Sequence, residues 1–102
     1  NVAIGASALY NNYDISNLVA IGDSALYYNG SGATSSQAIN NTAVGSKALY
    51  ANTTGSSNTA LGSNALRSNT KGWWNTAVGT GALRSDTSGY NNSALGFHSL
   101  YN

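Results

Sequence analysis

The chain has 102 residues, of which four are Lys or Arg and three are Asp or Glu, so its formal net charge is +1. So little charge removes the electrostatic basis for binding nucleic acid or an anionic membrane surface, and no run of about 18 apolar residues is present to span a bilayer. The chain contains no cysteine, which excludes a disulfide framework and makes a zinc site improbable. We therefore expect no metal, no cofactor and no membrane insertion of this segment.

The dominant feature of the sequence is an internal repeat. The tripeptide Ala-apolar-Gly occurs six times, at residues 3–5, 20–22, 43–45, 60–62, 77–79 and 94–96. Successive copies are 17 residues apart, except that 23 residues separate the second from the third. This period is too short for helical-hairpin repeats, which need roughly 33 residues, and the recurring Gly, Asn, Ser and Thr disfavour helix. The sequence predicts an all-β fold, a parallel β-solenoid of about six 17-residue turns that forms a single repeat domain over residues 1–102.

Each turn is predicted to contain a strand on the tripeptide, a bend, a second short strand around an Ala-Leu pair five residues later, and a polar turn. In chain order, the first turn ends with Ile15 where later turns have Gly, and the second contains an insertion loop near residues 30–39. Gly32, Gly55, Gly72 and Gly89 are predicted to close the next four turns. Two columns of Asn, exemplified by Asn41 and Asn52, are expected to form hydrogen-bonded ladders along the stack.

Two apolar rows follow the repeat, and a thin two-strand roll cannot enclose both of them together with its alanines. Neighbouring residues of a strand point to opposite faces, so one row beside the buried alanines needs another surface to cover it. We expect that surface to be another copy of the chain. The interface candidates are Ile4, Ile21, Val44, Leu61, Val78 and Leu95, and the alternative is the row that contains Leu49, Leu66 and Leu83.

The sequence offers little material for catalysis. Asp14, Asp23 and Asp86 fall at three different points of the turn, so they build no repeated carboxylate pair. His98 is the only histidine, and the abundance of Ser makes any Ser-His-Asp match uninformative. We therefore expect no catalytic residues.

Aromatic residues are the more informative surface feature. One column reads Tyr10, Tyr27, Tyr50, Arg67, Arg84 and Tyr101, and it is predicted to form a ladder of planar groups. Trp73 and Trp74 lie in a polar turn whose sister positions are Ser56 and Ser57, so the repeat does not need them. They either cover a seam between chains or present a contact patch. The surface-contact candidates are Trp73, Trp74, Tyr28 and Tyr90, with the 30–39 loop as a flanking wall.

The string Asn-Thr-Ala-Val-Gly-x-x-Ala-Leu, as in residues 41–49 and 75–83, resembles the head repeats of trimeric autotransporter adhesins and the repeats of phage-type tail fibres. The resemblance covers essentially the whole chain, although many autotransporter heads have shorter turns. It implies a left-handed β-roll in a side-by-side homotrimer, with the apolar-Gly strand at the trimer axis. The segment is then expected to be an internal fragment of a longer fibre.

The leading interpretation is a non-enzymatic, structural and adhesive segment of an extracellular bacterial or phage-type fibre, placed on a cell surface or a virion. Its partners would be its own copies and a glycan or protein of a host or environmental surface. One alternative is a carbohydrate-binding module that works by Tyr and Trp stacking. Another is an ice-binding solenoid. Two features argue against it: the Thr column has only one Thr per turn, and it is expected to continue into Leu18.

Overall fold

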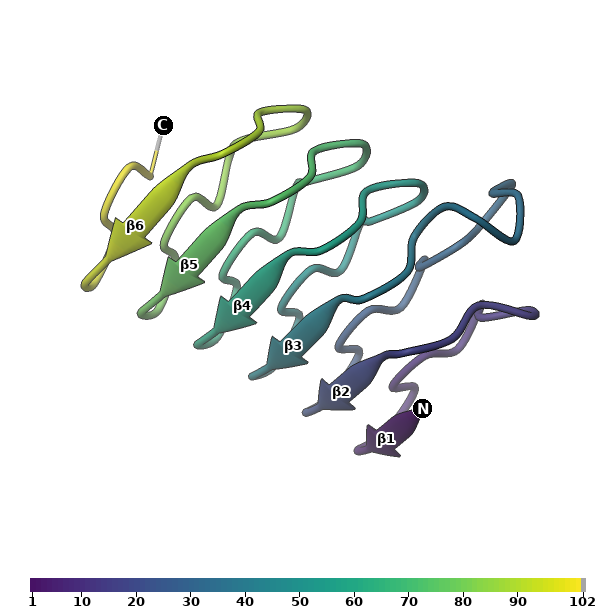
Figure 1. The fold of residues 1–102 in the computed structure, drawn as a ribbon. Coiled ribbons are helices and arrows are strands. Elements are labelled where there is room, and N and C mark those ends of the chain that lie inside the picture. Colours follow the sequence, from purple (N-terminus) through teal and green to yellow (C-terminus); the bar gives the residue numbers. More distant parts are fainter. Residues whose placement is uncertain (102) are drawn as a thin grey trace.

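The computed structural model describes residues 1–101 as a β-solenoid of about six turns with one six-stranded parallel sheet. The order of the strands in the sheet follows the chain, so each strand pairs with that of the previous turn, and the two ends of the chain lie at opposite ends of the stack (Figure 1). The strands are β1 (Val2–Ile4), β2 (Val19–Ile21), β3 (Thr42–Val44), β4 (Thr59–Leu61), β5 (Thr76–Val78) and β6 (Ser93–Leu95). The predicted all-β solenoid is confirmed.

The strands are in register, with the alanines of successive tripeptides paired along the sheet. The glycine that follows each strand explains why this register is strict. Gly62 has φ +132°, and a Cβ added to it would lie 2.6 Å from the backbone carbon and oxygen of Gly79 in the next turn. Only glycine, which has no Cβ, can adopt this positive φ while the backbone of the next turn lies so close. The six tripeptide glycines are therefore aligned along the stack.

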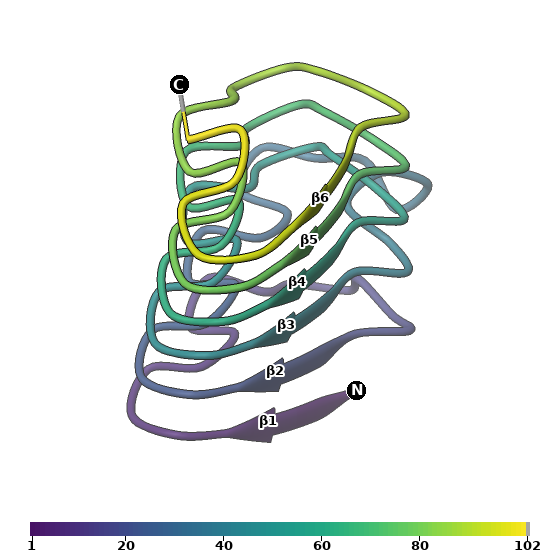
Figure 2. The same ribbon diagram turned by 90° about the vertical axis from the view of Figure 1, so that its left-hand side faces the viewer.

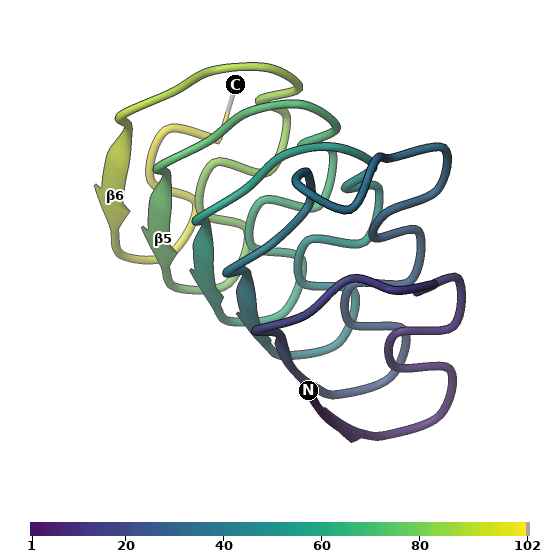
Figure 3. The same ribbon diagram turned by 45° about the vertical axis from the view of Figure 1, so that its right-hand side comes forward.

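The predicted second strand around each Ala-Leu pair is wrong. These segments curl instead of extending, because alternate residues adopt left-handed conformations, such as φ 57° at Lys47 and φ 50° at Leu49. The N–H of Ala48 closes a turn on the carbonyl of Gly45 at 3.2 Å, while the N–H of Leu49 still donates to Ala65 in the next turn at 3.0 Å. The sheet therefore forms one wall of the roll, and curled segments form the rest (Figures 2 and 3).

The interior of the roll consists of small and aliphatic side chains from both walls. The strand alanines at 20, 43, 60 and 77 and the second alanines at 25, 48, 65 and 82 are fully enclosed. The Leu column packs against them, with Leu26, Leu49 and Leu66 at 0% exposure. The alternative in which the Leu column faces other chains is therefore wrong, because the single chain already covers it.

Two Asn ladders complete the interior, as predicted. In one, the Nδ2 of Asn52 donates to the Oδ1 of Asn29 at 2.7 Å, and the Nδ2 of Asn69 donates to the Oδ1 of Asn52 at 3.1 Å. In the other, the Oδ1 of each Asn accepts the backbone N–H of its successor, as from Asn75 to Asn58 at 3.0 Å. Fully buried amides are tolerated here because the adjacent turns supply hydrogen-bond partners.

The insertion is the one irregular turn, and it forms the longer loop that precedes β3 in Figure 1. The chain leaves the regular path after Gly30, whose N–H donates to Thr53 at 3.0 Å, and rejoins it at Ala38, whose N–H donates to Thr54 at 3.1 Å. Ala38 thus occupies the position that Gly55 has in the next turn. The prediction that Gly32 closes this turn is wrong, since Gly32 lies in the inserted loop with open space around it.

Candidate functional site

The outer face of the sheet carries the first candidate set. In each strand the central alanine points into the roll, so the residues before and after it share the outer face. The residue after it forms the predicted interface column. Ile21, Val44 and Val78 are half-buried, and Leu61 is 37% exposed. At the two ends of the stack, Ile4 and Leu95 are 59% and 80% exposed. Unlike the Leu column, this column has no layer of its own chain over it.

The residue before each alanine forms a second outward column, consisting of Val2, Val19, Thr42, Thr59, Thr76 and Ser93. Val19 pairs with Thr42 in the sheet. The expectation that the Thr column continues into Leu18 is therefore wrong, because the next residue, Val19, occupies that column. Leu18 is 2% exposed and lies in the inner Asn column, where its N–H donates to the Oδ1 of Asn1 at 3.0 Å. Strand alternation alone indicates that both outward columns belong to one surface, which carries no charged residue.

The predicted ladder of planar groups forms along the curled wall. The rings of Tyr10 and Tyr27 stack at 5.0 Å between centroids with 6° between their planes, and Tyr27 stacks on Tyr50 at 5.3 Å. The guanidinium of Arg67 continues the stack 5.7 Å from the Tyr50 ring centroid. Tyr28 meets Tyr27 and Tyr50 edge-on, at 4.8 and 5.3 Å. Its contacts therefore attach Tyr28 to this ladder.

The other three surface-contact candidates come together at one corner of the roll, which we call the aromatic corner (Trp73, Trp74 and Tyr90). Trp73 and Tyr90 occupy one column in successive turns, and their rings stack at 5.1 Å with 8° between planes. Trp74 stands nearly perpendicular to Trp73, at 79° and 6.5 Å between centroids. All three side chains are exposed, by 42%, 62% and 59% for Trp73, Trp74 and Tyr90.

The inserted loop reaches the column of the aromatic corner only through its last residues. The N–H of Ser57 donates to the carbonyl of Ile39 at 2.9 Å, and the N–H of Trp74 donates to that of Ser56 at 3.2 Å. Ile39 and Trp73 are thus two turns apart in one column, with Ser56 between them. Within the loop, the Oε1 of Gln37 accepts the N–H of Thr34 at 3.0 Å.

The acids and the histidine are dispersed over the fold. Asp14 and Asp23 are exposed in different turns, and His98 stacks on Phe97 at 4.0 Å and lies 4.5 Å from the ring of Tyr101. Asp86 lies in an inner Asn column and accepts hydrogen bonds from Gly89 N at 2.8 Å and from Asn92 Nδ2 at 3.1 Å. Within residues 1–101, no group of three or more side chains is arranged to hold a metal ion.

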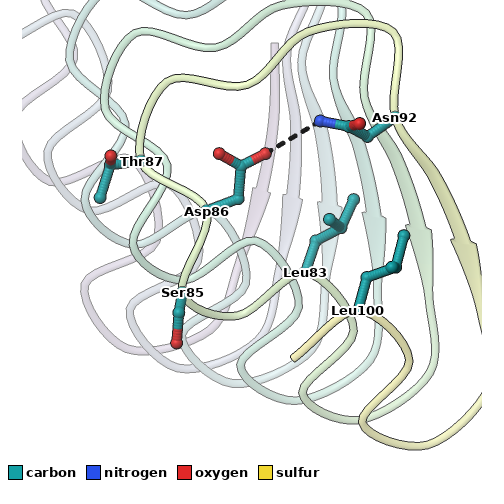
Figure 4. Close-up of a pocket in the computed structure, with 6 residues that line it drawn as sticks. All are labelled: Leu83, Ser85, Asp86, Thr87, Asn92 and Leu100. Atoms are coloured by element: carbon teal, nitrogen blue, oxygen red, sulfur yellow. Dashed lines mark hydrogen bonds between the residues drawn. The ribbon is translucent and has the colours of Figure 1, made fainter. Parts of the chain in front are cut away.

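A hollow of about 410 Å³ lies at the last complete turn, lined by Leu83, Ser85, Asp86, Thr87, Asn92 and Leu100. Figure 4 shows the carboxylate of Asp86 directed toward Asn92, while the side chains of Ser85 and Thr87 point away from that carboxylate. Leu83 and Leu100 belong to the inner Leu column, and Asp86 belongs to an inner Asn column. The hollow is therefore the interior of the roll where it opens at its last turn, and its hydroxyls do not converge on its carboxylate.

In the described part of the chain, no helix has the length and apolar character needed to cross a bilayer. The chain matches no protein-family model, no curated protein and no solved structure in the comparisons. Its similarity to fibre and adhesin repeats therefore rests on the residues of the repeat and stays a prediction.

Proposed function

We propose that this segment is a structural and adhesive part of an extracellular fibre, on a bacterial cell surface or a virion, in which three copies pack side by side as left-handed β-rolls. It has no enzymatic activity of its own in this proposal. The observation that carries it is the outward apolar column of the sheet, which continues through all six turns. Handedness and the number of copies follow from the repeat resemblance, and the need for a partner follows from the exposed column.

The exposed column is the part of the roll that one chain leaves unfinished. The interior is filled by the Ala, Leu and Asn columns, so the outer Ile, Val and Leu side chains add nothing to it. Burying apolar surface stabilises by about 25 cal/mol per Å², and contiguous exposed apolar patches usually mark interaction sites. Both outward columns lack charge, so no desolvation of a charged group opposes contact there.

The direction of the column favours a lateral partner. It runs along the stacking axis, so a partner that covers all of it lies alongside the roll and not at its end. A second copy presents the same column with the same spacing, because every turn has the same register. Identical copies that repeat such a contact around an axis form a closed ring with cyclic symmetry. This is the arrangement that a fibre shaft requires.

A Leu61→Asp variant tests the lateral interface, with Ser46→Asp as its matched control. Ser46 is exposed, outside the two outward columns, so both variants gain one negative charge but only Leu61→Asp places it on the interface. Sedimentation velocity should show trimer for the wild type and for Ser46→Asp, and monomer for Leu61→Asp, since an unpaired buried carboxylate costs several kcal/mol. A folded wild-type monomer at micromolar concentration would contradict the proposal.

The same surface supports one second candidate, ice binding. Thr42, Thr59 and Thr76 lie one strand spacing apart, and each shares the outer face with the Val or Leu two residues on. Such a regular array of hydroxyls and methyls is available to ice only if the face is free. A wild-type monomer that shows thermal hysteresis would favour this candidate, whereas a trimer would bury the array.

A further inference from the structure

The aromatic corner departs from the repeat in a way that the fold does not require. The column of Trp73 contains Ser16, Ile39, Ser56 and Tyr90 in the other turns, and the column of Trp74 contains Asn17, Asn40, Ser57 and Asn91. Small or polar residues alone build the same turn at 16–17 and 56–57. The backbone bonds of the corner match those of its sister turns, with Asn91 N donating to the carbonyl of Trp73 at 3.2 Å.

Trp74 is also in an unfavourable backbone conformation for its type. Its φ is 57°, and the residues in its column have φ between 56° and 62°. Asn is among the non-glycine residues that tolerate this left-handed region best, whereas a bulky residue there is an outlier. Packing does not offset the strain, because 62% of the Trp74 side chain is exposed. The fold requires this φ but not a tryptophan at the position, and such unexplained strain is typical of functional sites.

The shape of the corner suits a small flat ligand. On the side of the preceding turn, the column of Trp73 continues with Ser56, whose side chain is too small to cover an indole ring. Trp73 therefore keeps an open face there, and Trp74 stands at 79° to it. Ser57 and Asn91 flank Trp74 in its own column and carry neutral hydrogen-bonding groups. Residues 56–57, 73–74 and 90–91 include no charged side chain.

From these observations we propose that the aromatic corner binds a pyranose ring of a neutral glycan. The apolar face of the sugar stacks on the open face of Trp73, Trp74 borders it, and its hydroxyls bond to Ser57, which lies in the turn on that side. This proposal rests on the adhesive role proposed above and specifies its ligand class.

The available area distinguishes a sugar from a protein partner. Aromatic side chains present roughly 150–250 Å² each, so the exposed fractions at this corner leave about 300 Å² in all. A stable protein interface needs about 800 Å² from each partner. The corner is thus too small to hold a second protein by itself, but it matches one or two sugar rings. Repetition of the corner on neighbouring copies would raise the overall avidity.

The two tryptophans are the only ones in the chain, so tryptophan fluorescence reports on this site alone. The wild-type chain is titrated separately with maltotriose, cellotriose and chitotriose, and with glycerol as a solvent control. We expect a saturable change in tryptophan emission with at least one trisaccharide, at a dissociation constant on the order of 1 mM, and none with glycerol.

Two variants that restore sister residues complete the test: Trp73→Ser, as at Ser56, and Trp74→Asn, as at Asn91. Each should weaken sugar binding roughly tenfold or more, as expected when a stacked ring is lost, and Trp74→Asn should melt no lower than the wild type. The matched control is Tyr28→Ala, which copies Ala51 and should bind like the wild type.

No saturable response to any of the three sugars would overturn the sugar site. It would also be overturned if Trp73→Ser or Trp74→Asn dissociated the assembly, because the corner would then belong to a seam between chains. The proposed fibre assembly fails on a different measurement, the sedimentation of the wild type, so the two failures are distinguishable.

Discussion

Asp86 interrupts one of the two inner Asn ladders, and replacing it by Asn should stabilise the protein. In this ladder the Nδ2 of Asn52 donates to the Oδ1 of Asn29, and the Nδ2 of Asn69 donates to the Oδ1 of Asn52. The next position is Asp86, and an ionised carboxylate has no hydrogen to donate. As a result, the Oδ1 of Asn69 is buried without a hydrogen-bond partner.

The size of the effect follows from the bonds that Asp86→Asn restores. Its Nδ2 can donate to Asn69 Oδ1 and to the carbonyl of Gly89, as Asn52 does toward Asn29 and Gly55 at 2.7 and 2.8 Å. Its Oδ1 can still accept from Asn92, as Asn29 does from Asn41. The variant also loses the bonds that Asp86 Oδ1 accepts from the N–H groups of Gly89 and Ser88, at 2.8 and 3.3 Å. Since the gained bonds pair a buried oxygen while the lost ones lie nearer the surface, we expect a net gain of about 1 kcal/mol. For a domain of this size, such a gain raises the melting temperature by about 4–8 °C.

Thermal unfolding followed by circular dichroism, at one fixed protein concentration, measures this gain. Asp23→Asn is the control for charge, because it removes the same charge from an exposed carboxylate that accepts a bond from Ser24. Asn52→Asp is the reverse test, and it should destabilise by about 3 kcal/mol, since it removes two buried donor bonds. If Asp86→Asn melts no higher than Asp23→Asn, the ladder is not the source of stability that the structure indicates.

Two further predictions concern positions that the repeat holds constant. Gly62→Ala should prevent folding, because its Cβ would lie 2.6 Å from backbone atoms of Gly79. The control Gly32→Ala has open space around its Cβ and should cost only about 1 kcal/mol of stability despite its φ of +75°. A folded Gly62→Ala roll in circular dichroism would contradict the glycine alignment. Asn58→Ala should cost about 3 kcal/mol in denaturant unfolding, because it leaves the buried N–H of Asn75 and the carbonyl of Gly72 without this partner. Asn11→Ala, at a half-buried position outside both ladders, should have little effect, and equal losses in the two variants would count against the second ladder.

The stacking and register of the fold could be predicted from the sequence because they depend on spacing alone. Once Gly5, Gly22 and their successors must lie directly above one another, every other column is fixed by counting residues. The Asn ladders and the stacked Tyr column follow in the same way. Proximity within a column was therefore predictable, and the shared column of Trp73 and Tyr90 follows from counting, whereas the stacking of their rings is seen only in the structure.

The course of the chain around each turn was not predictable by counting. Leu9, Leu26 and Leu49 adopt φ values of 50–55°, although leucine alone gives no reason to expect a left-handed conformation. These conformations curl the chain and turn the Leu column inward, where the sequence suggested a strand and left its direction open. Which surfaces lie side by side depends on this curl. For the same reason, the contact of Tyr28 with Tyr50 could not be inferred from its position in the repeat.

Departures from the repeat in the interior differ from those on the surface. In the first turn, Ile15 and Leu18 replace the usual Gly and Asn, and both are almost fully buried. A Cβ on Gly30, in the next turn, would lie 2.7 Å from Ile15 Cγ1, so a glycine there makes room for the larger side chain. The carbonyl of Ile15 still accepts from Asn1 and Asn12, as the carbonyl of Gly55 accepts from Asn41 and Asn52.

An interior change is therefore matched by a change in the turn stacked on it, because the core is closely packed. Trp74 has no such matching change, and Trp73 has one only on the side of the next turn, where its ring stacks on Tyr90. Ser56 and Asn91 beside them are ordinary members of their columns, and the indole rings extend into solvent. Packing within the chain accounts for Ile15 and Leu18, but it leaves Trp74 and one face of Trp73 without a partner in the chain. This difference is the physical basis for proposing a glycan site at the aromatic corner and, separately, an assembly interface on the outer face of the sheet.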